Sequence, residues 1–131
     1  MARSVLPFLM FEGPAEEAMT FYVSLFPDGE VVDIAHFGPE GPGVEGSVMR
    51  ALFRIGDQTL MCMDSSVSHA FTFTPSISMF VDCESEEEQQ RLHDALIVGG
   101  QALMPLGDYG FSRRFAWLND RFGVSWQLNL A

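Results

Sequence analysis

Residues 11–17, FEGPAEE, and residues 81–87, VDCESEE, decide the fold, because each follows an apolar strand-like run and opens a helix. In the first stretch, Gly13 can serve as a cap, and Pro14 is preset for the first helical position. In the second stretch, Ser85 is followed three residues later by Glu88, which is the pattern of a capping box. The same strand-to-helix transition therefore occurs once in each half of the chain.

The first half extends outward from its transition as one strand, one helix and three strands. Apolar residues of the helix recur at i, i+3 and i+4, and the turn at residues 27–29, PDG, ends it. Gly56 and Asp57 predict a tight hairpin between the last two strands. The expected elements are a strand at 4–11, a helix at 14–26, and strands at 30–37, 47–55 and 58–63.

The second half repeats this order after a polar connector at residues 64–70. We expect a strand within 71–83, a helix from Ser85 to the glycines at 99–100, and strands at 101–106, 113–118 and 123–130. The sequence therefore predicts one α+β domain over residues 1–131, made of two βαβββ modules at 1–64 and 71–131. Neither module could bury both faces of its sheet alone, so we expect them to pair around a concave, partly closed mixed sheet.

Composition and charge narrow the classes of partner. The formal net charge of −11 repels phosphate backbones and anionic lipid surfaces, so neither nucleic acid nor a membrane is expected as a partner. No apolar run approaches the length of a membrane span, and the N-terminal residues lack the pattern of a signal peptide. The two cysteines, Cys62 and Cys83, form no disulfide framework, which favours a cytoplasmic location.

Three stretches carry a resemblance to a known family. They are residues 7–22 with PFLMFEG and AMTFY, residues 71–81 (FTFTPSISMFV), and residues 120–128 (DRFGVSWQL). On these motifs the chain resembles the vicinal oxygen chelate superfamily, which includes glyoxalase I, extradiol dioxygenases and bleomycin-binding proteins. It is most similar to the PhnB-like branch, often labelled after 3-demethylubiquinone 3-methyltransferase. The resemblance covers nearly the whole chain and implies the glyoxalase/bleomycin resistance-like fold.

Metal-dependent members of that superfamily bind a divalent ion through His and Glu on the first and last strands of each module. The resemblance places these positions at Pro7, Met61 or its neighbour Cys62, Ser76 and Gln127. Such a set lacks the three charged or imidazole ligands of a catalytic ion, so we expect neither a metal nor another cofactor. A methyl donor would need a Gly-rich strand-to-helix turn, and the sequence contains no G-x-G-x-x-G.

The remaining reactive side chains have simpler interpretations. His36, His69 and His93 have no metal-ligand spacing, so we expect surface or hydrogen-bonded positions, with acid–base chemistry as the alternative. Cys62 lies in an apolar run that would keep its thiol neutral. Cys83 precedes a helix, but neighbouring glutamates oppose a thiolate there.

Arg50 is the candidate cation of the cavity. Arg50 and Arg54 are four residues apart, so they share one face of their strand. The apolar residues that alternate with them are expected on the other face: Met49, Ala51, Phe53 and Ile55. If the arginine face lines the cavity, Arg50 can grip a carboxylate or phosphate, whereas on a solvated face it would pair with an acidic residue. Arg113 and Arg114 are similar candidates in the second half.

Two functions follow from these residues. The first is a small-molecule binding protein without the divalent metal, whose ligand contacts Arg50, Ser76, Gln127, Tyr109 and Trp117. The alternative is a metal-independent enzyme acting on a small polar or anionic substrate in the same cavity. Whether the chain is catalytic stays open, because no base or nucleophile is evident. The high apolar content also predicts a homodimer.

Overall fold

The computed structural model describes residues 2–131, which divide into two compact units at the boundary between His69 and Ala70. These units are called the first and second modules below. The first contains β1 (Phe8–Phe11), α1 (Ala15–Ser24), β2 (Glu30–His36), β3 (Val48–Ile55) and β4 (Gln58–Asp64). The second contains β5 (Met79–Asp82), α2 (Glu86–Ile97), β6 (Gln101–Gly107), β7 (Arg114–Asn119) and β8 (Ser125–Leu130). The repeated order of one strand, one helix and three strands confirms the predicted α+β fold.

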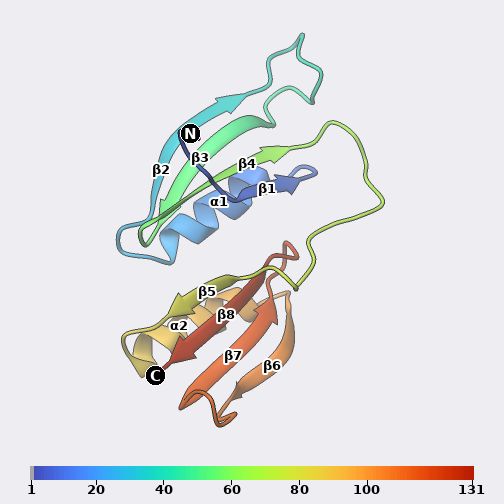
Figure 1. The fold of residues 1–131 in the computed structure, drawn as a ribbon. Helices are drawn as coiled ribbons and strands as arrows, with labels where there is room; N and C mark the ends of the chain where they lie inside the picture. The colour runs from blue at the N-terminus through green and yellow to red at the C-terminus, as the bar shows by residue number, and fades with distance from the viewer. Residues whose placement is uncertain (1) are drawn as a thin grey trace. The chain divides into compact units, whose positions relative to one another are not determined.

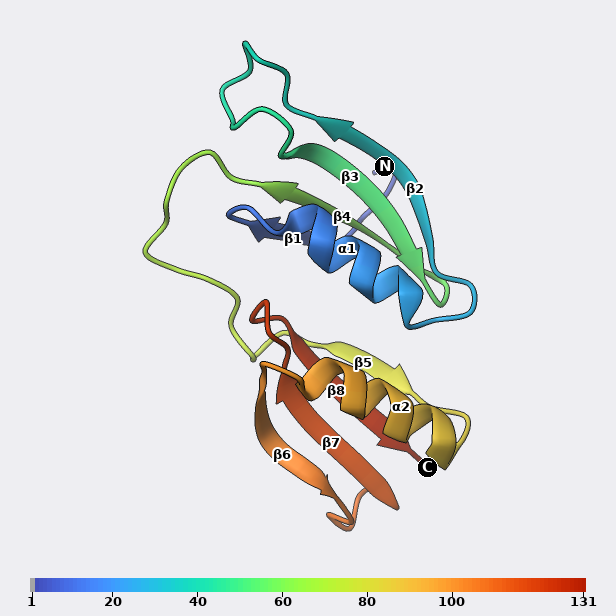
Figure 2. The same cartoon turned by 180° about the vertical axis from the view of Figure 1, so that it is seen from behind.

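Each module has a four-stranded mixed sheet. The strand orders are β1-β4-β3-β2 and β5-β8-β7-β6, with the first and last strands of each module parallel and the other neighbours antiparallel. In each module the helix covers one face of its own sheet, as Figure 2 shows, and Figure 1 shows the same sheets from the side that carries no helix. We call that second side the open face.

The start of α1 is stabilised from the far end of its module. Pro14 occupies the N-cap position rather than the first helical turn, and no side-chain hydrogen bond comes from it. Instead the buried Asp64 carboxylate accepts the backbone N–H groups of Gly13 (2.8 Å) and Ala15 (3.0 Å) at one oxygen. Its other oxygen accepts the N–H of Val48 at 2.9 Å. One buried carboxylate therefore ties α1 to the ends of β3 and β4.

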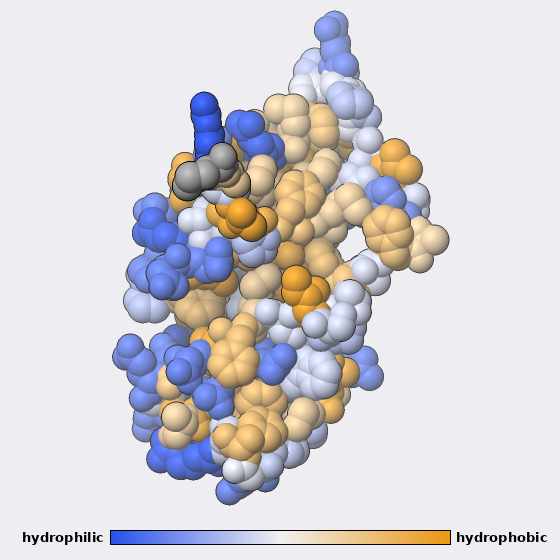
Figure 3. Space-filling view, viewed as in Figure 1, coloured by the Kyte–Doolittle hydropathy of each residue, from blue (hydrophilic) through white to orange (hydrophobic). Residues whose placement is uncertain are grey.

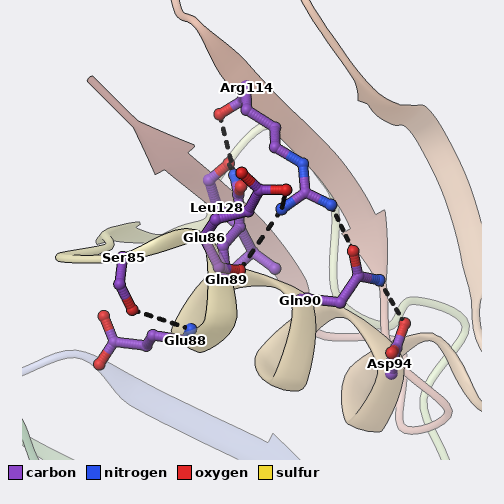
Figure 4. A network of polar contacts seen from close by, with 8 residues as sticks. All are labelled: Ser85, Glu86, Glu88, Gln89, Gln90, Asp94, Arg114 and Leu128. Atoms are coloured by element: carbon purple, nitrogen blue, oxygen red, sulfur yellow. Dashed lines mark hydrogen bonds and ion pairs between the residues drawn. The ribbon is translucent and has the colours of Figure 1, made fainter.

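The second helix is fixed by its own cap and by a buried amide. Ser85 Oγ accepts the Glu88 N–H at 3.1 Å, as the capping-box pattern predicts. The Gln89 amide is fully buried and donates to the backbone carbonyls of Arg114 (2.8 Å) and Leu128 (3.1 Å), which joins α2 to β7 and β8 (Figure 4). These bonds lie on the helix-covered face of the second sheet, so they leave the open face available for other contacts.

Two other local expectations, besides the position of Pro14, were wrong. The first strand begins at Phe8 rather than Ser4, so residues 4–7 are not part of the sheet. Met49 does not share the buried face of β3, because Ala35 pairs with Arg50 and His36 with Val48, leaving Met49 as the extra residue of a bulge. Among the described residues, no helix is long and apolar enough to cross a membrane.

Candidate ligand pocket on the second sheet

Side chains alternate along β8, so apolar residues and amides lie on opposite faces of the second sheet. Trp126 and Leu128 are buried on the side of α2, whereas Gln127 and Asn129 point to the open face. Gln127 pairs with Trp117 on β7 and with Phe80 on β5. Three strands thus present an amide between two aromatic rings.

A pocket of about 380 Å³ lies on this open face. Its volume falls within the range of roughly 300–1,000 Å³ typical of small-molecule sites. Figure 3 shows apolar side chains gathered on the same side of the second module. Five apolar or aromatic residues and two amides line the pocket, and all belong to the second module: Phe80, Met104, Phe111, Phe115, Trp117, Gln127 and Asn129.

The Trp117 ring is held by a short chain of hydroxyl groups. Its indole Nε1–H donates to Ser125 Oγ at 2.8 Å, and Ser125 Oγ lies 2.7 Å from Ser78 Oγ. Ser78 Oγ in turn donates to the Pro75 carbonyl at 3.4 Å. An indole N–H can only donate and a carbonyl can only accept, so Ser125 must donate to Ser78. The indole N–H is therefore already satisfied and contributes its ring face, not a donor, to the pocket.

The two amides of the pocket differ in what they leave available. Asn129 Nδ2 donates to the Asp82 carboxylate at 2.9 Å, which uses one of its donors. Within residues 2–131 the Gln127 side chain makes no hydrogen bond, although it is partly buried. An uncommitted carboxamide offers two donors and one acceptor in a single plane. Gln127 is therefore the principal polar group available to a ligand.

One wall of the pocket belongs to an aromatic cluster. Phe111 stacks on Tyr109 with ring centroids 6.2 Å apart and meets Phe115 edge-on at 4.9 Å. The Tyr109 hydroxyl donates to the Pro105 carbonyl, so its polar end is already paired. Tyr109 supports the wall from behind Phe111 and is not itself among the lining residues.

The predicted ligand contacts are distributed over several elements. Gln127 and Trp117 line the pocket, and Tyr109 supports it. Ser76 is exposed in the segment before β5, where its Oγ lies 3.1 Å from Thr74 Oγ1, and it does not line this pocket. Arg50 lies on the open face of the first sheet, where it is 59% exposed and its guanidinium lies 3.6 Å from the Asp33 carboxylate. The roles of Ser76 and Arg50 in binding stay predictions.

Sequence reasoning missed five of the lining residues. Asn129 follows Gln127 by two residues on β8 and alternates with the buried Leu128 and Leu130, so this alternation could have placed it beside Gln127. Phe80 and Met104 lie on β5 and β6, which contain no buried residue, and β6 has a register shift on either side of Met104. Phe115 is buried like its neighbour Ala116, so no alternation marks it either. Phe111 lies in the loop before β7, where no such periodicity exists.

The register of β4 shows whether Met61 or Cys62 occupies the family's metal position in the first module. Phe8 pairs with Met61 and Leu9 with Cys62, while the Met61 N–H donates to the Pro7 carbonyl at 2.9 Å. Met61 therefore lies on the open face, whereas Cys62 is buried beneath α1. A thioether and a proline do not fit the oxygen and nitrogen ligands of a hard divalent ion. The second module offers Gln127 at the position of Met61, and the ladder makes Met79 the counterpart of Pro7.

The titratable side chains of the described part of the chain gather into no metal-binding group of three His, Cys, Asp or Glu. His36 Nε2 lies 2.7 Å from Glu16 and His93 Nδ1 lies 3.1 Å from Asp94, while His69 bonds Ser65. These contacts agree with the expectation of hydrogen-bonded histidines. Asp94 has a lowered pKa because it accepts hydrogen bonds from His93 and Gln90.

Both cysteines are buried free thiols. Desolvation by burial, with Asp64 nearby, raises the pKa of Cys62 to about 12. Burial, with Glu88 and Asp82 nearby, raises the pKa of Cys83 to about 11. Neither thiol forms a thiolate near neutral pH, so neither is an activated nucleophile.

The chain contains two βαβββ modules, each with one helix-free sheet face, and this is the fold of solved vicinal oxygen chelate proteins. The fosfomycin resistance protein FosX from Listeria monocytogenes, complexed with Mn(II), shares the fold at 14% identity and a TM-score of 0.63, over 98% of this chain and 93% of that one. At that identity the similarity concerns the fold alone.

The chain belongs to the 3-demethylubiquinone-9 3-methyltransferase family, whose sequence profile matches residues 3–129. A PhnB protein from Bacillus cereus is 53% identical, with a TM-score of 0.95, over 98% of this chain and 100% of that one. Protein PA1353 from Pseudomonas aeruginosa is 30% identical, with a TM-score of 0.84, over 98% of both chains. A comparison with curated proteins gives no match.

Proposed function

We propose that this protein binds a small organic molecule in the pocket of the second sheet, without a divalent metal. The observation that carries the proposal is the lining itself, which combines apolar side chains with a single uncommitted amide, Gln127. Ligand sites are typically apolar cavities with a few polar groups that fix orientation. No acid, base or thiol lines this pocket, which favours binding over catalysis.

Metal independence is supported by the chemistry of the family's ligand positions. Pro7 has no donor side chain, Met61 and Met79 are soft thioethers, and Gln127 is a neutral amide. Ser76, which the sequence placed at the position of Met79, is also neutral. FosX, which shares the fold, was solved with Mn(II), so the fold itself can hold an ion in a relative. The difference lies in the side chains, since hard divalent ions prefer carboxylate and imidazole ligands.

Methyl transfer, the reaction in the family's description, has little support from this chain. The glycine-rich segment at residues 38–46 joins β2 to β3, which are both strands. A nucleotide-like methyl donor would be expected at a Gly-rich turn between a strand and a helix N-terminus. We therefore do not propose that reaction.

A second candidate is a metal-independent enzyme or binder for a small anionic molecule held by Arg50. The observation that favours it is the long 3.6 Å contact between Arg50 and Asp33, both more than half exposed. An exposed pair of this kind is worth at most about 1 kcal/mol, so an anion could replace Asp33 at little cost. Arg50→Ala would then weaken anion binding by about tenfold or more.

The proposal also includes a homodimeric assembly and a cytoplasmic location. Several large apolar side chains outside the pocket are exposed, among them Val67, Phe71 and Ile77, each 61–68% exposed. Apolar surface of this kind supports a homodimer, because self-complementary patches are buried when copies pair. Two unpaired thiols support a cytoplasmic location.

A thermal-shift screen tests the proposed function. Neutral bicyclic aromatics and small carboxylates or phosphates are compared with the wild-type protein, Phe111→Ala and Arg50→Ala. Phe111 and Arg50 are both well exposed, so both variants are expected to fold. Stabilisation by neutral aromatics that Phe111→Ala reduces supports the pocket. Stabilisation by anions alone, lost in Arg50→Ala, would favour the second candidate.

A further inference from the structure

We infer that the pocket selects a neutral, planar, fused-ring ligand whose edge carries a hydrogen-bond donor next to an acceptor, as in a cyclic amide. This inference rests on the proposed function and names the class of ligand. It comes from three properties of the lining: its charge, its free polar atoms and the arrangement of its rings.

The lining carries no charge. All seven lining residues are apolar, aromatic or carboxamide side chains, and the protein as a whole carries a formal net charge of −11. An anionic ligand would lose its hydration without gaining a cationic partner in the pocket. A permanently cationic ligand would find no carboxylate among the lining residues. A neutral ligand avoids both costs.

Gln127 supplies a matched pair of donor and acceptor. The indole of Trp117 is already bonded to Ser125, and Asn129 already donates to Asp82, whereas the carboxamide of Gln127 is uncommitted within the described residues. The N–H and C=O of a carboxamide lie side by side in one plane, so they complement a cyclic amide with two parallel hydrogen bonds. A ligand with only one of the two groups would leave half of Gln127 unpaired.

Aromatic rings flank the amide and favour a flat ligand. Phe80 and Trp117 are the cross-strand partners of Gln127 on either side, so a ring system bonded to the amide edge lies between them. Phe111 and Phe115 meet edge-on at 4.9 Å and close one side of the pocket. Offset stacking and edge contacts with such rings favour a planar aromatic over a flexible chain. The volume of about 380 Å³ suits a ligand of two fused rings rather than a large one.

Isothermal titration with four bicyclic probes tests this inference. 2-Quinolone carries the donor and acceptor side by side, N-methyl-2-quinolone lacks the donor, protonated 2-aminoquinoline has two donors, and 2-naphthoate is an anion. Wild-type protein is expected to bind 2-quinolone about tenfold tighter than its N-methyl analogue, since the methyl group leaves a buried acceptor unpaired.

Substitutions of Gln127 are expected to change that preference in defined ways. Gln127→Leu should bring the ratio of the two quinolones to about one, because no amide remains to discriminate them. Gln127→Glu presents two acceptors and should invert selectivity toward 2-aminoquinoline, a gain that a misfolded variant could not show. Gln101 is exposed on β6 and outside the pocket, so Gln101→Leu and Gln101→Glu are matched controls that should leave both ratios unchanged.

The outcomes separate this inference from the function on which it rests. Equal affinity of wild type for both quinolones, or tighter binding of 2-naphthoate, would overturn the donor–acceptor class while leaving small-molecule binding intact. Selectivity that persists in Gln127→Leu would overturn the assignment to Gln127. If none of the four probes binds at millimolar concentration, both the ligand class and the proposed pocket fail.

Discussion

Trp117 and Gln127 lie opposite each other on β7 and β8, and both side chains face the helix-free side of the second sheet. The Trp117 indole is fixed by Ser125, while the Gln127 amide stays uncommitted among the described residues. The fixed Trp117 ring favours binding, because a side chain that is already ordered loses little conformational entropy when a ligand binds. The free amide of Gln127 then supplies the polar contact.

Removal of the Ser125 hydroxyl should loosen the Trp117 ring. Ser125→Ala leaves the indole N–H and Ser78 without their partner in a buried position, so we expect a loss of about 1–3 kcal/mol in the free energy of unfolding. Urea unfolding followed by circular dichroism measures it. Ser24→Ala is the control, since Ser24 Oγ bonds only the nearby Phe21 carbonyl at an exposed helix end. Equal, small effects of both substitutions would show that the hydroxyl chain does not order the pocket.

Loss of the Asp64 carboxylate should strongly destabilise the protein. Asp64→Ala leaves three N–H groups, of Gly13, Ala15 and Val48, without their acceptor, and we expect a loss of about 3 kcal/mol or more. Asp64→Asn keeps one acceptor oxygen and should lose less. Asp57, in the exposed turn between β3 and β4, provides the control Asp57→Asn. Stability unchanged in Asp64→Ala would contradict the assignment of Asp64 as the cap of α1.

The buried thiol of Cys62 should make stability fall at alkaline pH. Its pKa is raised from 9.0 to about 12, so the folded protein keeps it neutral while the unfolded chain ionises. The contribution of Cys62 to stability is therefore complete below pH 9 and is lost as the pH rises toward 12, with a slope of at most about 1.4 kcal/mol per pH unit for this one thiol. Urea midpoints between pH 8 and 11 check this. Cys62→Ala should make the decline shallower and leave the part that Cys83 causes, since burial raises the pKa of that thiol to about 11. An identical decline in the variant would show that Cys62 does not contribute.

Light scattering tests the proposed homodimer. The chain mass is 14.6 kDa, and we expect twice that value across micromolar concentrations, since the exposed aromatic side chains favour pairing of copies. Phe71→Ser removes one of these side chains and should weaken association, whereas Val44→Ser, at an exposed apolar position in the loop between β2 and β3, is the control. A monomer mass at every concentration would contradict the homodimer.

The repeated βαβββ order could be predicted from the sequence because apolar residues recur with different spacings in helices and strands. The residues that cap α2 are also close together in the sequence. The sequence could not predict that Asp64 caps α1, since the two segments come together only after the sheet has formed. The bulge at Met49 likewise depends on pairing with β2, and it reverses the expected burial of that residue. Gln127 and Trp117 were chosen as ligand contacts from the sequence, but Phe111 was not, because the position of a loop residue depends on tertiary contacts.

The most direct test of the central claim is the affinity for 2-quinolone before and after treatment with EDTA, with metal content measured on the same untagged protein. A metal-independent pocket should bind 2-quinolone with an unchanged dissociation constant, and both samples should contain far less than one divalent ion per chain. An affinity that EDTA abolishes and that one equivalent of Mn(II) restores would contradict a metal-independent binding pocket.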